Sequence, residues 1–451
     1  MIEETLSAVS NEGFERRIGL FSAITINMSQ MVGVGPFLTI PLMLTAMGGP
    51  QAIIGWLVGS VLAVADGLVW SELGTALPSS GGPYTFLKEA YGRWTGNLTP
   101  FLFVWSMVLA TPLLMSTGMI GMAQYLAQPL STLWPGHTLL LTRGLAVGAT
   151  GLTVALLYRR IALVATITKV LWAGMLLTVG LVLLAALTHF DTHQVLAVPA
   201  GALTPTPAFF TGMGSALILA MYNFMGYQTV AHLGDEVKNP ARVLPRAIIL
   251  SIAGVAVIDL ALQIAVTGVL PWREAAASPA VAALLLTRVW GPWAGGLITV
   301  LIAWTAFASV FTGILGASRL PYNAARDGLF LPIFGRLHPT LGFPHMALLG
   351  MAGLTAVACL FDLATVINAL TALFILVQFI GQIGALVVLR ITRPAMPRPF
   401  RQWLYPLPCV VALCGWLAVF WATGWAAICL ALLWLGVGSL VYLWRLRPRP
   451  T

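Results

Sequence analysis

Two stretches rich in glycine, proline or side-chain amides interrupt apolar runs in which a helix would otherwise continue. They are residues 33–37 (GVGPF), near the middle of the first run, and residues 222–228 (YNFMGYQ), in the sixth. Glycine weakens a helix and proline removes an amide donor, and a bilayer tolerates such backbone where it lines a cavity. Alone, the first stretch fits a packed proline kink as well as an unwound segment that binds a carboxylate. Interruptions at corresponding places in two five-span halves favour a central binding site.

Ionisable side chains within apolar runs are the second group of candidates. Lys169 lies roughly 12–14 Å beyond the arginine pair at 159–160, at 1.5 Å per helical residue. That is a long reach for snorkelling to the interface, and a desolvated lysine can gain and lose a proton near neutral pH. Asp66 and Asp259 also fall within runs, with Glu72 nearer to an end. For these three, structural hydrogen bonding is favoured over ion coupling.

The composition is that of a membrane protein. Of 451 residues, 59% are hydrophobic and only 8% are charged, with a mean hydropathy of +0.92. Soluble domains carry about a quarter charged residues, so this chain cannot cover a soluble surface. A span takes about 20 apolar residues, which predicts one all-α membrane domain. The twelve expected spans are residues 18–45, 50–77, 97–127, 138–157, 161–187, 208–233, 246–270, 293–318, 345–361, 364–389, 404–423 and 425–444.

The basic residues predict the orientation of these spans. With the N-terminus in the cytoplasm, 19 of the 23 lysines and arginines fall on the cytoplasmic side. Arg143, Arg273 and Arg288 fall outside, and Lys169 lies within a span. This asymmetry is the positive-inside signature, and it explains the pI of about 9.8 without a nucleic-acid partner. We expect both termini in the cytoplasm and a cell membrane, the bacterial inner membrane, as the location; no cleavable signal is recognised in residues 1–17.

Other classes of protein fit the pattern less well. A membrane enzyme needs a nucleophile and a base, or metal ligands, at one depth, and none of the six histidines supplies such a set within a span. His189 and His193 flank Asp191 in an expected external loop, where a solvated face is favoured. Neither a catalytic nor a metal site is therefore predicted. A nutrient sensor of the same fold is disfavoured by the absence of a long soluble tail.

Three segments expected on the cytoplasmic side carry a family resemblance. They are residues 72–84 (ELGTALPSSGGPY), 235–245 (DEVKNPARVLP) and 318–329 (SRLPYNAARDGL). With them the whole chain resembles the amino acid–polyamine–organocation superfamily. The resemblance implies a leucine-transporter fold of roughly twelve helices. Residues 1–17 would be a cytoplasmic segment, and residues 18–391 a core of two inverted repeats, 18–187 and 208–391. Residues 392–451 would add two helices and a short tail.

The resemblance also implies roles for three residues of the first stretch and four of the second. The amides of the first would bind a substrate carboxylate, and carbonyls of the second would hold its amine, with two aromatic rings closing the pocket. The implied substrate-binding residues are Gly33, Val34, Gly35, Asn223, Phe224, Gly226 and Tyr227, with Phe224 and Tyr227 as the closing rings.

The coupling ion is implied to be a proton. Lys169 matches the fifth-helix lysine that replaces a sodium site in proton-coupled and sodium-independent members. Ser309 and Thr312 of the eighth helix are its expected neighbours, together with the backbone near Gly33. Neither sodium nor another cofactor is expected.

One departure from the family bears on the substrate. Both interrupted stretches are similar to segments of plant-type polyamine symporters, which usually carry an acidic pair where this chain has residues 38–41 (LTIP). An unpaired buried ammonium is costly, so a small, neutral amino acid is favoured as the substrate of an alternating-access transporter in the lipid bilayer. A polyamine or cationic amino acid remains open if Asp66 or Asp259 faces the pocket, and so does sodium-independent exchange.

Overall fold

The structure is a computed structural model. It describes residues 16, 18–78, 82–130, 136–157, 161–234, 236–326, 328, 330–338 and 343–445. The side chains of residues 161–172, 308, 312, 315–319, 323 and 445 lie outside the described part, although the helices that carry them are described.

All regular elements of the described residues are helical, apart from one bridge between Ile18 and Val237. The elements are α2 (Leu20–Met31), α3 (Gly35–Met47), η1 (Pro50–Ala52), α4 (Ile53–Ala76), α5 (Pro83–Thr95), α6 (Leu98–Leu130), α7 (Thr138–Leu157), α8 (Ile161–Thr188), α9 (Thr192–Val195), α10 (Pro207–Phe224), η2 (Thr229–Leu233), α11 (Pro240–Val269), α12 (Trp272–Ala277), α13 (Val281–Trp290), α14 (Pro292–Arg326), η3 (Pro332–Gly335), α15 (His345–Ala358), α16 (Leu363–Phe374), the π-helical stretch η4 (Ile375–Ile380), α17 (Gly381–Thr392), α18 (Leu407–Ala422) and α19 (Trp425–Arg445).

The long helices are the membrane spans, and their number is close to the expected one. Within the described residues, eight helices are long and apolar enough to cross a bilayer, and a ninth span arises if α2 and α3 are counted together. Three further expected spans coincide with α8, α15 and α18. Their apolar stretches, Ala173–Thr188, His345–Ala358 and Leu407–Ala422, are each shorter than 18 residues. The chain is therefore a multi-pass all-helical membrane protein, and twelve spans stay a prediction.

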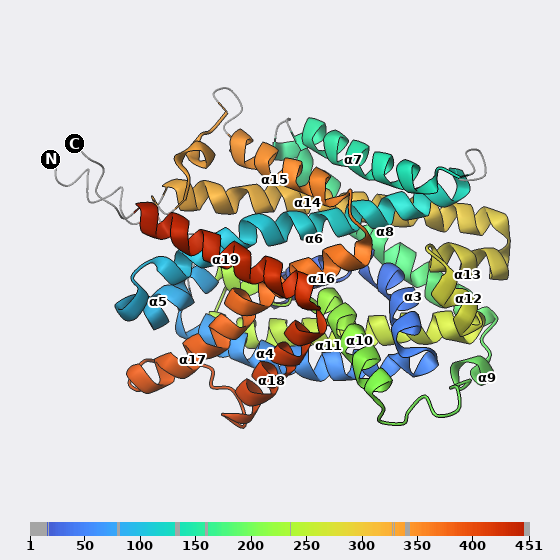
Figure 1. Cartoon of the computed structure of the whole chain (residues 1–451), viewed down its shortest axis with the longest axis horizontal. Helices are drawn as coiled ribbons and strands as arrows, with labels where there is room; N and C mark the ends of the chain where they lie inside the picture. The colour runs from blue at the N-terminus through green and yellow to red at the C-terminus, as the bar shows by residue number, and fades with distance from the viewer. Residues whose placement is uncertain are drawn as a thin grey trace.

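The helices form two groups. In one, α4 packs against α11, α10 and α18, while α11 packs against α2 and α10 against α3. In the other, α6 packs against α14, α7, α15 and α16. Helix α8 lies between them, in contact with both α11 and α14. Figure 1 shows the long helices nearly parallel, with α5 and the end of α17 at one end of the molecule and α9, α12 and α13 at the other.

Small residues bring α4 and α10 close together. Gly55 and Gly59 of α4 face Ala216 and Ala220 of α10, and a Cβ atom on either glycine would lie within 2.8 Å of the opposing alanine Cβ. In a membrane, where lipid is as apolar as leucine, such close packing is a main source of helix association. This contact fixes α10, and hence the second interrupted stretch, against the middle of the first helix group.

Candidate functional site

The first interrupted stretch is a true helix break. Helices α2 and α3 are separated by residues 32–34 and bent by 50° relative to each other. Helix α3 begins at Gly35 with Pro36 in its first turn, a position where proline loses no helical hydrogen bond. The first amides of α3 and the last carbonyls of α2 have no partner within their own helices. The break therefore presents both amide donors and carbonyl acceptors.

The second stretch is also broken. Helix α10 ends at Phe224, and the short helix η2 begins only at Thr229. Gly226 between them has φ +132°, a conformation that side chains rarely allow, and a Cβ atom there would lie 2.8 Å from Cβ of Gln30. Its amide donates to Oε1 of Gln228 at 3.1 Å. Glycine is thus required where the second break touches the end of α2.

The two breaks meet at a common cavity of about 50 Å³. Gly33, Val34 and Gly35 line it from the first break, α6 and α14 form the opposite walls, and the end of α10 completes it. One helix N-terminus, that of α3, and two helix C-termini, those of α2 and α10, converge here, so partial positive and partial negative charge lie side by side. The polar side chains that line it are Gln30, Thr117, Tyr222, Asn223 and Ser309.

Asn223 joins the two breaks. Its Nδ2 donates to Oγ1 of Thr39 at 2.9 Å and to the carbonyl of Leu219 at 2.8 Å. Its Oδ1 is buried, has no hydrogen-bond partner among the described residues, and lies where a Cβ atom on Gly35 would be. A buried acceptor without a donor is costly, and an ammonium group in the cavity would satisfy it.

Of the residues implied in proton coupling, only Ser309 is placed with its side chain. It lines the cavity, and its Oγ lies 3.7 Å from the position of a Cβ atom on Gly33. Lys169 lies on α8 and Thr312 on α14, two helices that pack against each other, but both side chains are outside the described part. Ser309 lies beside the first break, and its expected contact with Lys169 stays a prediction.

Three implied substrate contacts do not line this cavity. Phe224 is fully buried against Trp56 of α4, with ring centroids 6.5 Å apart. Tyr227 is fully buried and its hydroxyl donates to Oδ2 of Asp66, also on α4. Gly226 lies between them against the end of α2. The rings of Phe224 and Tyr227 point toward α4 rather than into the cavity. The roles of all three residues toward a substrate therefore stay predictions.

The wall that α6 contributes was not expected from the sequence. Thr117 shares a hydrogen bond of 2.7 Å with the hydroxyl of Tyr222, and Met115 and Gly118 lie beside them. Tyr222 belongs to the second interrupted stretch, so it could have been predicted from the sequence as a residue that lines the site. The α6 residues could not, because nothing in their apolar run distinguishes them from other positions.

No carboxylate lines the cavity among the described residues. Asp66 and Asp259 are fully buried elsewhere, on α4 and α11. A second, more open cavity of about 480 Å³ lies at the end of the molecule that carries α12 and is bounded by α3, α6 and α16. Leu38 lines it and packs on Gly121 of α6.

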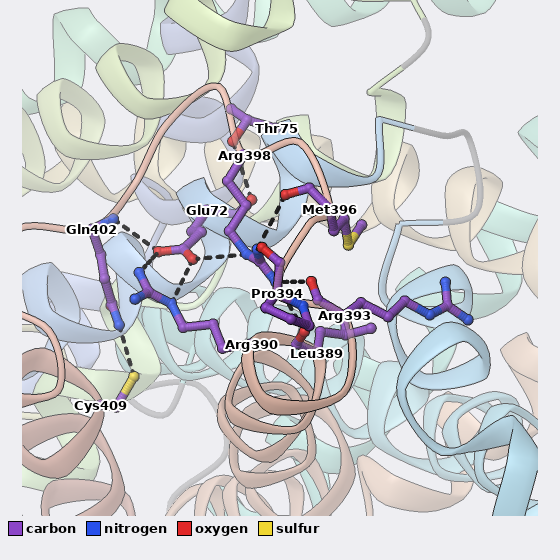
Figure 2. A network of polar contacts seen from close by, with 10 residues as sticks. All are labelled: Glu72, Thr75, Leu389, Arg390, Arg393, Pro394, Met396, Arg398, Gln402 and Cys409. Carbon is purple, nitrogen blue, oxygen red and sulfur yellow. Dashed lines mark hydrogen bonds and ion pairs between the residues drawn. The ribbon is translucent and has the colours of Figure 1, made fainter.

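Glu72, at the other end of α4, is held by a dense polar network (Figure 2). Its carboxylate accepts two hydrogen bonds from Arg390 of α17, at 2.8 and 2.6 Å, and one from the amide of Gln402 at 2.8 Å. Nε of Arg398 lies 3.6 Å away. Arg398 also donates to the carbonyl of Leu389 at 2.9 Å, near the end of α17. The cluster ties α4 to α17 and to the loop before α18, as the structural reading of Glu72 expected.

Two broken helices that meet at a polar cavity within a bundle of spans are a pattern typical of the binding sites of transporters. The chain matches the amino acid permease family model over residues 18–441 and belongs to that family. It is 27% identical to the branched-chain amino acid permease BcaP of Bacillus subtilis (strain 168), over 98% of this chain and 95% of BcaP. It is 29% identical to Asc-type amino acid transporter 1 of Mus musculus, over 90% and 75% of the two chains, and 25% identical to the serine/threonine exchanger SteT of B. subtilis (strain 168), over 90% of each.

Proposed function

We propose that the protein is a secondary active transporter of small, neutral amino acids that binds its substrate between the two helix breaks. The observation that carries this proposal is the cavity at which the N-terminus of α3 meets the C-termini of α2 and α10. An α-amino acid carries a carboxylate and an ammonium group on adjacent carbon atoms. The amide end of α3 suits the carboxylate, and the carbonyl ends with Oδ1 of Asn223 suit the ammonium.

The lining of the cavity supports a neutral side chain. A lysine-like or polyamine substrate needs a partner for its second ammonium group, and the described lining residues offer none. The relatives are named for branched-chain amino acids and for serine and threonine. A substrate with an aliphatic or hydroxylated side chain would meet Met115 and Val310 at the border of the cavity, and the lining helices would have to move apart to admit it, because about 50 Å³ is less than the volume of an amino acid.

Transport would proceed by alternating access around this site. The group formed by α2, α3, α4, α10 and α11 would rock against the group formed by α6, α7, α14 and α15. In this proposal residues 18–187 and 208–391 are the two repeats, and residues 392–451 add two helices. The end with Arg93 of α5 and Arg393 beyond α17 would face the cytoplasm, and Arg273 and Arg288 would face outward.

A proton is the proposed coupling ion, with Lys169 as its carrier. Helix α8, which bears Lys169, packs on α14, which bears Ser309 and Thr312. Ser309 in turn lies beside Gly33 of the first break. A lysine here would be charged when it holds a proton and neutral when it has released one. Each state would interact differently with the carbonyls and hydroxyls at the break. Sodium is not part of the proposal.

Uptake into proteoliposomes tests the proposal. The purified chain is reconstituted and offered labelled neutral, cationic and acidic amino acids and putrescine, with and without an inward proton gradient. Uptake of a neutral amino acid that rises with the gradient is expected. Uptake of putrescine instead would contradict the substrate assignment, whereas binding without flux would indicate a sensor.

A further inference from the structure

Asp66 lies deep within the membrane-spanning part of α4. Ten residues separate it from Ala76, the nearer end of the helix, which is about 15 Å at 1.5 Å per residue. Its side chain is fully buried. An aspartate side chain is too short to reach an interface from that depth, and an intramembrane carboxyl group without a structural explanation points to function.

The polar contacts of Asp66 are few. Its Oδ2 accepts a hydrogen bond from the hydroxyl of Tyr227, while its Oδ1 has no partner among the described residues. The indole N–H groups of Trp70 and Trp416 face the carboxyl group but lie outside hydrogen-bonding geometry. An ionised carboxylate needs several donors when it is removed from water. Among the described residues, one hydrogen bond reaches this buried carboxyl group, and its Oδ1 is left without a donor.

Glu72, six residues along the same helix, shows the opposite case. It is equally buried, but two arginines and a backbone amide hold its carboxylate. Asp259 of α11 is fully buried and neither of its oxygens has a partner among the described residues, so nothing ties it to a helix break. Of the three acids, Asp66 alone is joined to a residue of a break.

Tyr227 connects Asp66 to moving parts of the molecule. It lies in the second break, directly after Gly226, and its ring packs on Phe379 with centroids 6.5 Å apart. Phe379 belongs to the π-helical stretch η4 and stacks on Trp416 of α18 at 4.0 Å. Single π-helical turns are frequent at functional sites. A change in the Tyr227 hydrogen bond would therefore alter the packing of the second break, of the α16–α17 segment and of α18.

Other titratable groups face this cluster from the neighbouring elements. His232 of η2 stacks on Trp70, with ring centroids 6.1 Å apart, and its Nε2 has no partner among the described residues. The thiol of Cys409 on α18 is within electrostatic reach of Asp66. Asp259 lies on α11, which packs against α4, and the Glu72–Arg390 pair joins α4 to α17.

We propose that Asp66 is a second proton-binding group of the transporter and that Tyr227 couples its protonation to the geometry of the second break. The proposal rests on the proposed function, since it assumes proton-linked transport. A proton from the aqueous phase forms an O–H bond with the carboxylate, which becomes neutral. The neutral acid no longer attracts the Tyr227 hydroxyl as strongly, and the second break is released. Loss of the proton to the other side restores the carboxylate and the hydrogen bond, so one proton is translocated and Tyr227 keeps its own.

Asp66→Asn tests this proposal in proteoliposomes made with the full chain. Asparagine has the shape of the protonated acid and still accepts the Tyr227 hydrogen bond, but it cannot exchange a proton. An inward gradient of about one pH unit, coupled one to one, supports about tenfold accumulation of substrate. Since Lys169 and Asp66 would each carry one proton, we expect about hundredfold accumulation in the wild type and about tenfold in Asp66→Asn, where Lys169 remains. Counterflow, which needs no net proton movement, persists. Asp66→Glu should restore part of the accumulation, and the matched control Asp259→Asn should accumulate like the wild type.

The outcomes separate this proposal from the proposed function. Accumulation by Asp66→Asn at the wild-type level would overturn the role of Asp66 alone. Wild-type accumulation that ignores the gradient would overturn proton coupling and this proposal with it. Absence of any amino acid flux in the wild type would overturn the proposed function itself. If Asp66→Asn loses counterflow too, Tyr227→Phe decides: removal of the donor to the carboxylate should move the pH dependence of transport to higher pH, and an unchanged profile would refute the coupling.

Discussion

Gly35→Ala should disable substrate binding, because the added methyl group would occupy the place of the Asn223 side-chain oxygen. Oδ1 of Asn223 lies closer to that position than any real Cβ atom tolerates. The amide cannot swing aside freely, since its Nδ2 is held by Thr39 at 2.9 Å and by Leu219 at 2.8 Å. The variant must shift the backbone of α3 or lose these bonds.

The size of the effect follows from the cost of overpacking. A misfit of this kind in a well-packed interior costs about 1–3 kcal/mol. If the cost falls on the bound state, affinity drops by about 5- to 150-fold, at 1.4 kcal/mol for each factor of ten. The same change would also displace Oδ1 of Asn223, a lining oxygen that has no donor among the described residues, so we expect the upper part of this range.

The assay is saturable uptake of a labelled neutral amino acid, together with thermal unfolding of the purified variant. Gly33→Ala is the comparison in the same break, because its methyl group meets only Oγ of Ser309, at an ordinary 3.7 Å. Gly144→Ala on α7, where nothing lies within 4 Å, is the neutral control. We expect a large rise in KM for Gly35→Ala, a smaller one for Gly33→Ala and none for Gly144→Ala. A Gly35→Ala variant that unfolds earlier but keeps the wild-type KM would refute the placement of the substrate in this cavity.

Two further predictions concern carboxylates. Glu72→Gln removes the fully buried anion that pairs with Arg390, 21% exposed, and Arg398, 7% exposed, and should destabilise the protein by about 3 kcal/mol, the lower end of the range for a wholly buried pair. Glu89→Gln, which breaks the half-exposed pair with Arg393, should cost at most about 1 kcal/mol; equal losses in thermal unfolding would contradict the assigned role of the network. Asn223→Asp adds a carboxylate to the cavity and should weaken neutral amino acid uptake while improving competition by cationic amino acids. An unchanged competition profile would place the substrate elsewhere.

The sequence predicted the elements that carry the site better than the directions in which their side chains point. Both breaks were predictable, because glycine and proline within an apolar run leave few other conformations. The directions in which the Phe224 and Tyr227 side chains point were not predictable, because helical periodicity is lost where the helix unwinds. The α6 wall gave no signal, as Thr117 and Met115 look like ordinary residues of a buried span.

The three intramembrane acids show the same limit. Sequence position indicated that Asp66, Glu72 and Asp259 are sheltered from water, and all three are fully buried. Their partners come from helices far away in the chain: Tyr227 for Asp66, and Arg390 and Arg398 for Glu72. Such partners depend on tertiary packing, which no local pattern records.

The central claim is that a neutral amino acid binds where the two breaks meet. Counterflow tests it most directly: proteoliposomes loaded with an unlabelled neutral amino acid are given a trace of the same labelled compound, with no ion gradient. The account predicts rapid entry of the label, blocked by other small neutral amino acids but not by putrescine or lysine, and strongly reduced in Gly35→Ala. Label that enters only in exchange for putrescine or lysine, or that enters Gly35→Ala at the wild-type rate and KM, would contradict it.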